Sequence, residues 1–443
     1  MWPEIIDHLK DAALVAKIQE AFGVKIHYRK CLKDYEKEEK PVEEKLDSNS
    51  SDYIHFDGKE KKNQYNGYTV IKGRNSDEDV GKKRTNLLND KAGQDEIQSI
   101  QGPTYDGPNY TITNYFWYYL FLFGTELGDE VFYCAFIPFW FWNIDGAVGR
   151  RVVLVWATVM TIGQILKDII CWPRPACPPA VRLQSKWSQE YGMPSTHAMI
   201  GISIPFGVVL YTMNRYIYPL YVGCIIAFLW CALVCMSRLY LGMHTVLDIL
   251  AGLILAVALM IPLVPLVDAT DYYIVSNIWA LAILVVISII TIIYYPCSER
   301  WTPTRGDTTM VVSVTAGVHV GAWLNYNTGA MIAPTLPPPY VIMWPSYNML
   351  GRMILRTTLG FCSVVATKAI CKTFSYATMC AILKVNSKDL MQSNDCAQNS
   401  NKTLVELVYK YITCFMIGIN TVYLLPNVFT VIGIERPTFY TEM

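Results

Sequence analysis

The sequence predicts an all-α fold, a polytopic membrane bundle of about eight to ten transmembrane helices. Of the 443 residues, 52% are hydrophobic. Apolar runs of membrane length dominate the chain from Tyr115 onward, and residues 275–295 carry no charge. A helix needs about 20 apolar residues to cross the hydrocarbon core of a bilayer, so these runs are long enough. This pattern excludes a soluble globular protein, and a net charge of zero gives no reason to expect a nucleic-acid partner.

The N-terminal quarter of the chain differs in composition from the rest. Residues 1–107 are rich in Lys, Glu and Asp, and residues 50–107 contain no long apolar run. We therefore predict a polar, partly disordered tail over 1–107. Apolar residues at helical spacing predict an amphipathic helix near 3–22, lying on the membrane surface or on the protein's own cytosolic face. These residues are Ile5, Leu9, Ala12, Val15 and Phe22.

The membrane spans are assigned from the apolar runs. Residues 115–142 are rich in aromatic side chains but are interrupted by acidic ones, so we expect one long tilted helix or a hairpin of two short helices. Clear spans are expected at about 152–170, 197–213, 217–236, 245–267 and 275–295. Weaker candidates lie at 308–324, 352–384 and 411–434.

Three polar clusters fall at span ends that face the same side. The first span ends in Lys167 and Arg174, and the second begins on that side with Ser195–His197. The third span returns there, so the segment 237–248 joins the same face. The opposite span ends carry Arg150, Arg151 and Arg215. Excess Arg marks the cytoplasmic side of a membrane, so the clusters are expected to face the lumen or the exterior.

The cations and the helix start in these clusters suit a dianionic phosphoryl group. Arg174 and Arg238 each offer a planar fork that matches two phosphate oxygens, and Lys167 offers a point charge. Ser195 stands where a helix is expected to begin, so it can cap that helix and leave the N–H groups of Thr196 and His197 aimed at an anion.

The remaining residues of the clusters indicate a nucleophile and an acid. His244 and Asp248 are four residues apart at the start of a helix, so the carboxylate can accept the imidazole Nδ1–H. Nε2 is then left unprotonated, as a nucleophile requires. His197, on another helix, would be the partner acid. Asp168 is assigned no catalytic role.

Each of these residues taken singly has a plainer interpretation. A lone Lys167 or Arg at a span end is usually an interfacial anchor, a lone His an interior residue and a lone Ser195 an N-cap. Independent anchors, however, have no reason to gather three cations, two His and one Asp on one membrane face. No Cys/His group has metal-ligand spacing and no carboxylate cluster suits Mg²⁺, so we expect neither a metal nor a cofactor.

The three segments KDIICWPRP, PSTH and SRLYLGMHTVLD resemble the three-part signature of the type-2 phosphatidic acid phosphatase superfamily. That superfamily also includes glucose-6-phosphatase and the vanadium haloperoxidases. Its second motif usually reads Pro-Ser-Gly-His, and here Thr196 replaces the glycine. This variant, the segment 124–130 (GTELGDE), the run PFWFWN and the extra C-terminal spans resemble the sphingosine-1-phosphate phosphatase branch.

The resemblance implies a six-helix-type lipid phosphatase core within residues 108–270, with additional transmembrane helices over 271–443. It also implies residence in the endoplasmic reticulum membrane and a lumenal active site. The expected reaction is hydrolysis of a sphingoid phosphate through a phosphohistidine on His244. The expected partners are the lipid phosphate and the bilayer, and we also expect that a homodimer can form.

Sphingoid phosphates carry a cationic amine near the phosphate, and the acids of 115–142 need a role. We expect Glu126 first, and Asp129 second, to meet that ammonium group. It is equally plausible that these acids pair with a neighbouring basic side chain or cap the helix break. If the loop after residue 170 faces an oxidising lumen, Cys171 and Cys177 could form a disulfide.

Three alternative functions remain open at this point. One is a phosphatase of the same chemistry with broader lipid-phosphate or isoprenoid-pyrophosphate specificity, and another is glucose-6-phosphatase-like action. The third is a lipid transporter or scramblase that keeps the pocket without turnover. The pairing of His244 with Asp248 argues against the third, because a binder has no use for an oriented imidazole nucleophile.

Overall fold

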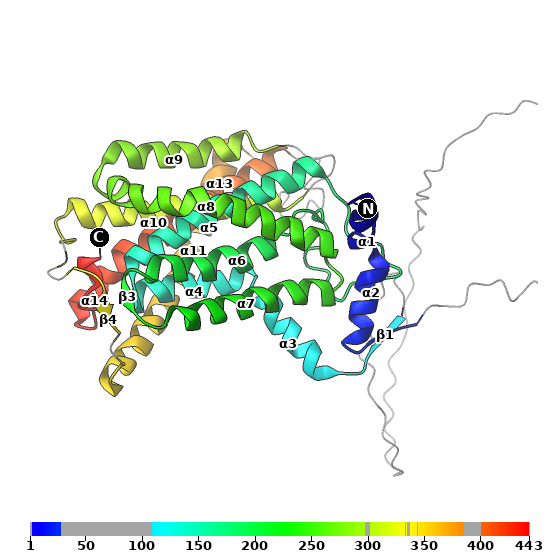
Figure 1. The fold of residues 1–443 in the computed structure, drawn as a ribbon. Coiled ribbons are helices and arrows are strands. Elements are labelled where there is room, and N and C mark those ends of the chain that lie inside the picture. The colour runs from blue at the N-terminus through cyan, green and yellow to red at the C-terminus, as the bar shows by residue number, and fades with distance from the viewer. Residues whose placement is uncertain are drawn as a thin grey trace, which may run out of the picture. The chain divides into compact units, whose positions relative to one another are not determined.

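The computed structural model describes residues 2–27, 109–296, 302–332, 334, 337–342, 344–384 and 400–442. Helices dominate, as the all-α prediction requires (Figure 1). The helices are α1 (Trp2–Leu9), α2 (Ala12–Ala21), α3 (Tyr115–Glu126), α4 (Glu130–Asn143), α5 (Gly146–Ile170), α6 (Thr196–Thr212), α7 (Leu220–Tyr240), α8 (Val246–Ser276), α9 (Ile278–Ile293), α10 (Thr304–Asn327), α11 (Tyr347–Leu383), α13 (Ser400–Ile419) and α14 (Leu425–Ile432). A π-helical turn, η2 (Asn420–Leu424), joins α13 to α14, and η3 (Phe439–Thr441) is a 3-10 turn.

Two short sheets accompany the helices. Strand β1 (Val24–His27) pairs antiparallel with β2 (Asn109–Ile112), so Val24 lies opposite Ile112. Strand β3 (Tyr216–Ile217) pairs in parallel with β4 (Tyr340–Val341). Each sheet has two strands, too few to form a layer of its own, and the fold remains a helical bundle.

Among the described residues, five helices are long and apolar enough to cross a membrane: α5, α7, α8, α11 and the continuous helix Asn401–Ile432. Helices α6 and α9 are shorter and also apolar. The chain is therefore a multi-pass membrane protein. The last span was predicted to begin near 411, but α13 begins at Ser400. Its first turns are polar in sequence, and they are stabilised by burial of Val405 and by the pair Glu406–Lys410 at 2.8 Å.

The acidic segment within 115–142 breaks one helical path into two helices, α3 and α4, that keep the same direction. Going along this path, the Phe121 ring contacts that of Tyr240, Gly124 packs against Leu233 and the Phe132 ring contacts that of Trp230. Over residues 121–136 the path therefore runs antiparallel to the second half of α7 and does not fold back as a hairpin. Asp129 caps α4 by accepting from the Glu130 amide at 2.6 Å.

The predicted amphipathic helix near 3–22 forms as two helices, because Asp11 caps a new helix start and breaks the first. Helix α2 lies across the end of the bundle where α7 ends (Figure 1). The polar clusters lie at this end too, so α2 packs on the protein's own surface at the same end as the clusters. A shared apolar cluster of Val24, Phe121, Tyr240 and Met243 holds the N-terminal elements there. The predicted tail beyond residue 27 lies outside the described residues.

The C-terminal helices share one hydrophobic core with the helices that carry the motifs. Val152 and Met199 belong to the same buried cluster as Val311 and Val422. Asp168, left unexplained by its sequence, ties the two parts together at the end of α5. Its carboxylate accepts hydrogen bonds from Tyr295 at 3.0 Å, from Thr302 at 3.2 Å and from Thr304. The C-terminal helices therefore buttress the helix turn that carries Lys167.

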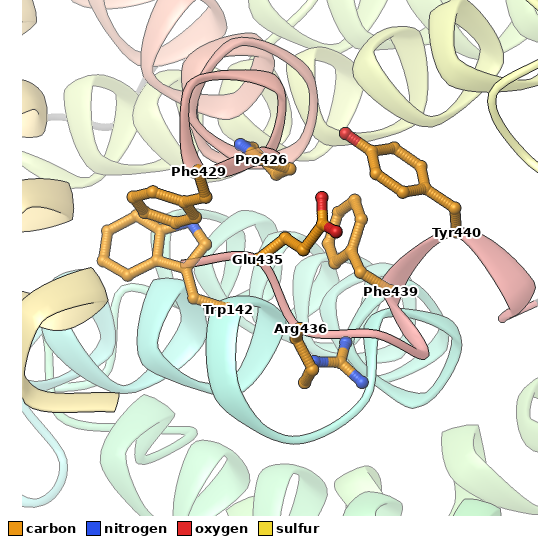
Figure 2. A pocket seen from close by; sticks show the side chains of 7 residues that line it. All are labelled: Trp142, Pro426, Phe429, Glu435, Arg436, Phe439 and Tyr440. Carbon is orange, nitrogen blue, oxygen red and sulfur yellow. The ribbon is translucent and has the colours of Figure 1, made fainter. Parts of the chain in front are cut away.

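The C-terminal segment closes the opposite end of the bundle. The Arg436 guanidinium donates to the Ile144 carbonyl at 2.8 Å and pairs with Glu442. The Glu442 main-chain oxygen accepts from Arg150 at 3.2 Å. Figure 2 shows a small pocket at this end, lined by Trp142, Pro426, Phe429, Glu435, Arg436, Phe439 and Tyr440. Aromatic rings line this pocket, and it lies at the other end of α5 from Lys167. It therefore reflects packing of the C-terminal segment and is not a reaction site.

Candidate active site

The end of α5 provides the first cation of the site. Lys167, in the last turn of α5, is fully buried. Its Nζ donates to Glu190 Oε2 at 2.7 Å and to Thr196 Oγ1 at 3.1 Å. The first and second motifs thus meet directly. The helix ends at Ile170, because Cys171 takes the left-handed conformation with φ 52°.

Arg174 reaches the site from the loop that follows α5. Its Nε donates to the Glu190 carbonyl at 2.8 Å, and its Nη1 donates to the Met243 carbonyl at 2.7 Å. The first motif is therefore joined to the residue before His244. Cys171 and Cys177, on either side of Arg174, are both free thiols in the structure.

Glu190 is a site residue that the sequence did not reveal. It is buried, its carboxylate pairs with Lys167, and Arg174 Nη2 lies 3.8 Å from the same oxygen. Burial by itself would raise the pKa of Glu190, but the two cations outweigh burial and lower that pKa. An ionised carboxylate therefore balances the cations. The only sequence signal was its position in the loop just before PSTH, where an acid is easily taken for a solvated loop residue.

Arg238, at the end of α7, brings a second guanidinium into the cluster. Its Nη1 donates to Thr125 of α3 and to Gln184 Oε1, the latter at 3.3 Å. The side chain is fully buried, yet its Nε and Nη2 have no hydrogen-bond partner among the described residues. Buried N–H groups are rarely left unpaired, because the loss of water costs about 1–3 kcal/mol or more for a charged group. These groups are suited to receive an anion.

The second motif forms the start of α6, as its sequence predicts. Ser195 is the N-cap, and its Oγ accepts from the Ala198 amide at 3.5 Å. His197 follows within the first turn, largely buried, with the Trp187 ring edge-on at 6.2 Å. A Cβ on Gly128 would lie 3.1 Å from His197 Cδ2. Glycine at 128 therefore lets the α3–α4 junction approach the histidine.

The third motif places His244 in the short loop between α7 and α8, but it does not form the predicted hydrogen bond. His244 Nδ1 lies 3.8 Å from Asp248 Oδ2, beyond hydrogen-bond distance. That oxygen instead accepts from the Thr245 amide at 2.7 Å, and the Asp248 amide donates to Thr245 Oγ1 at 3.2 Å. This reciprocal capping box starts α8. The Thr245 amide and the His244 imidazole therefore compete for the same carboxylate oxygen, and the amide at the helix start holds it.

Both ring nitrogens of His244 remain without a hydrogen-bond partner within the described ranges, and the residue is buried. Burial and then the nearby cations Arg174, Arg238 and Lys167 lower the pKa of His244 well below its ordinary value. The imidazole is therefore neutral at physiological pH, which is the form required of a nucleophile.

The lowered pKa predicts where the acidic limb of the reaction lies. A group with a depressed pKa loses its proton at lower pH, so the neutral imidazole should persist below pH ~6.5. The pH profile of kcat/KM has an acidic limb for each group that must lose a proton. We expect the limb due to the enzyme, and not to the substrate, to lie below that pH. Two substrates whose phosphates differ in their second pKa separate this limb from substrate ionisation, because only the substrate limb moves between them. An enzyme limb above pH 7 would contradict the assignment.

The acids predicted to meet a substrate amine lie at the edge of the site. Asp129 is buried, but besides capping α4 it pairs with Lys186 at 2.8 Å. Both alternatives considered for it, a basic partner and a helix cap, are therefore realised. Glu126 is exposed. It follows Thr125, which contacts Arg238, so Glu126 lies next to the cationic cluster.

Buried cations and two histidines are thus gathered at one end of a membrane helical bundle. The PAP2 superfamily model matches residues 149–272, which include all three motifs. Sphingosine-1-phosphate phosphatase 1 of Rattus norvegicus is 39% identical over 346 residues, covering 78% of this chain and 79% of the relative. Sphingosine-1-phosphate phosphatase 2 of Mus musculus is 37% identical over 333 residues, with 74% and 91% covered.

The chain belongs to the PAP2 superfamily and, within it, to the family of the sphingosine-1-phosphate phosphatases. It is a phosphoric monoester hydrolase. A more distant relative is the lipid phosphate phosphatase delta of Arabidopsis thaliana, 28% identical over 258 residues, with 56% of this chain and 60% of the relative covered. No solved structure matches the chain.

Proposed function

We propose that the protein hydrolyses sphingosine 1-phosphate and related sphingoid base phosphates to the sphingoid base and phosphate. The phosphate-binding site is inferred from the buried cluster of cationic side chains. Two guanidinium nitrogens of Arg238 have no partner among the described residues, and Lys167 and Arg174 lie in the same buried cluster, balanced there by Glu190. A phosphate dianion would satisfy these donors.

The proposed reaction has two steps. Nε2 of the neutral His244 attacks phosphorus, the bond from phosphorus to the substrate oxygen breaks, and the imidazolium form of His197 donates a proton to that oxygen and becomes neutral. His197 then takes a proton from water, the water oxygen bonds to phosphorus, and the bond from phosphorus to His244 breaks. Lys167, Arg174, Arg238 and the amides that follow Ser195, beginning with Thr196, would hold the other phosphate oxygens and stabilise their charge.

The substrate class is tested by comparing hydrolysis rates across sphingoid, glycerol, isoprenoid and sugar phosphates. The proposal expects sphingoid phosphates to give the highest kcat/KM. A preference for isoprenoid pyrophosphates, or equal rates for all lipid phosphates, would favour the broader enzyme. Highest activity on glucose 6-phosphate would favour the sugar-directed one.

The role of Glu126 gives a sharper test of recognition. In a sphingoid phosphate the ammonium lies on the carbon next to the phosphate-bearing one, and Glu126 is adjacent to the residue that contacts Arg238. We expect Glu126→Gln to lower the preference for sphingosine phosphate over lysophosphatidate by about fivefold, the effect of losing one partly exposed ion pair. Glu130→Gln, at a half-exposed neighbouring acid, is the matched control. An unchanged preference in Glu126→Gln would mean that the amine binds elsewhere.

We further propose residence in the endoplasmic reticulum membrane with the site facing the lumen. Two observations support one orientation for the site and Asn401. Asp168 bonds to Thr304 at the start of α10, and Gly306 packs against Lys410, so α13 begins near the site end. Asn401, in an Asn-Lys-Thr sequon, is exposed at that start.

This orientation is tested by glycosylation. We expect Asn401 to carry a glycan when the chain is expressed in cells, because acceptor sequons are modified only in the lumen. The test uses a chain in which the sequons at Asn49 and Asn109 are removed. A glycosidase should shift the band of this chain and leave unchanged the band of the same chain with Asn401→Gln. Absence of a glycan at Asn401 in this single-sequon chain would argue against a lumenal site. The homodimer stays a prediction, which chemical cross-linking in membranes would test.

A further inference from the structure

The N-terminal helix α2 contributes a buried amide to the end of the bundle that holds the site. Gln19 is fully buried although its neighbours Lys17 and Glu20 are exposed. Its Nε2 donates to the Val181 carbonyl at 2.6 Å and to the Tyr240 carbonyl at 2.8 Å. Its Oε1 accepts from the Val181 amide at 2.9 Å. A primary amide has two donors and an acceptor, so this side chain matches all three main-chain groups.

These three hydrogen bonds join two segments of the site. Val181 belongs to the loop that carries Arg174 and Glu190. Tyr240 ends α7, two residues after Arg238 and four before His244. Gln19 therefore bonds to both segments at once.

The two segments also touch directly beside Gln19. The Leu183 amide donates to the Leu241 carbonyl at 3.1 Å. Gly242 has φ +65°, and a Cβ there would lie 2.1 Å from the Val181 carbonyl oxygen and 3.0 Å from Gln19 Nε2. The left-handed conformation and the close approach both require glycine. The chain then continues into Met243, whose carbonyl holds Arg174, and into His244.

We propose that Gln19 is a positioning residue for the phosphatase reaction. It fixes the spacing between the loop that carries Arg174 and the segment that carries Arg238 and His244. Since the nucleophile and the phosphate-binding cations must be set within a fraction of an ångström, a shift of about 1 Å can cost roughly 10²-fold in rate. Gln19 lies far outside residues 149–272, the region that matches the superfamily. Helix α2 is on this view part of the catalytic unit.

The alternative is that Gln19 only anchors α2 to the bundle. Both views predict a loss of stability when the amide is removed, so stability does not separate them. A positioning role predicts a loss in kcat with little change in KM, and a recovery when one hydrogen bond is restored. Each variant is compared with the wild type on the same lipid phosphate, so the result does not depend on which lipid is preferred.

The experiment uses the full chain in detergent with Gln19→Ala, Gln19→Glu and the control Glu20→Ala. We expect Gln19→Ala to lower kcat about 10- to 100-fold with KM within about twofold, and Glu20→Ala to match the wild type. In Gln19→Glu a carboxylate would face two carbonyl oxygens, whereas the protonated acid can donate to one of them. The ratio of its kcat to that of the wild type should therefore rise as pH falls, while the ratio for Gln19→Ala stays flat.

Two results would overturn the proposal. One is a kcat for Gln19→Ala within twofold of the wild type, whatever its melting temperature. The other is a Gln19→Glu ratio that does not change with pH. If Gln19→Ala fails to accumulate, the isosteric Gln19→Glu variant decides alone, since a rising ratio at low pH supports positioning and a flat ratio refutes it.

Discussion

Replacing His244 with alanine is expected to lower kcat by about 10⁴-fold or more, because the proposed reaction proceeds through a bond from phosphorus to His244 Nε2. The surrounding cations would remain, so binding of the phosphate group should be weakened far less than turnover. Brief incubation with substrate labelled in the phosphate, followed by an alkaline quench that preserves phosphoramidates, should trap labelled wild-type protein. The same treatment should leave His244→Ala unlabelled.

His197→Ala serves as the matched comparison for that experiment. If His197 donates the proton to the leaving oxygen, its loss should slow phosphoryl transfer from an alkyl phosphate by about 10²- to 10⁴-fold. An aryl phosphate with an acidic phenol needs no such proton, so its first step should be nearly restored and label should accumulate on His244. Label that persists in His244→Ala would mean that another group is the nucleophile.

Asp248→Asn is expected to lower kcat by about 10³- to 10⁴-fold while leaving the fold intact. The amide oxygen of asparagine can still accept from the Thr245 N–H, so the capping box that begins α8 should survive. The amide cannot stabilise a cationic imidazole as a carboxylate does, and a comparable change in catalytic triads has an effect of this size. Steady-state kinetics together with thermal unfolding in detergent measure the two consequences separately.

This variant decides between two roles for the Asp248 carboxylate. The 3.8 Å distance to His244 Nδ1 and the 2.7 Å bond from the Thr245 amide favour a capping role. Catalytic hydrogen bonds often shorten when substrate binds, so the distance does not exclude an orienting role. Thr245→Ala is the control, expected to cost about 1 kcal/mol of stability with kcat within about tenfold. A loss below tenfold in Asp248→Asn would make Asp248 a cap alone.

The sequence predicted the parts of the site that depend on local pattern. Successive spans cross the membrane in opposite directions, so the order of the spans tells on which side each one ends. Lys167, Ser195 and Arg238 could therefore be assigned to one face without a structure. The N-cap at Ser195 follows from residue type and position, and it is confirmed. The contact of Lys167 with Thr196 and that of Arg174 with Met243 confirm that the motifs meet.

The sequence did not reveal groups whose partners are distant along the chain. Gln19 and its partners are separated by more than 150 residues, and Thr125 reaches Arg238 over a comparable distance. Glu190 looked like an ordinary loop acid because nothing local signals that two cations converge on it. The His244–Asp248 bond was predicted from helical spacing, but the spacing could not show that the Thr245 amide competes for the same oxygen.

By itself, then, the sequence determined that this protein crosses the membrane several times and that three motifs suited to phosphate chemistry share one side of it. Both results rest on periodicity and residue type, which act over a few turns of helix. Only the tertiary structure decided which carboxylate balances the cations, where Asp168 finds its three hydroxyls and why α2 belongs with the site. Those outcomes depend on which buried polar groups come within about 3 Å of one another, and packing of the whole bundle sets that distance.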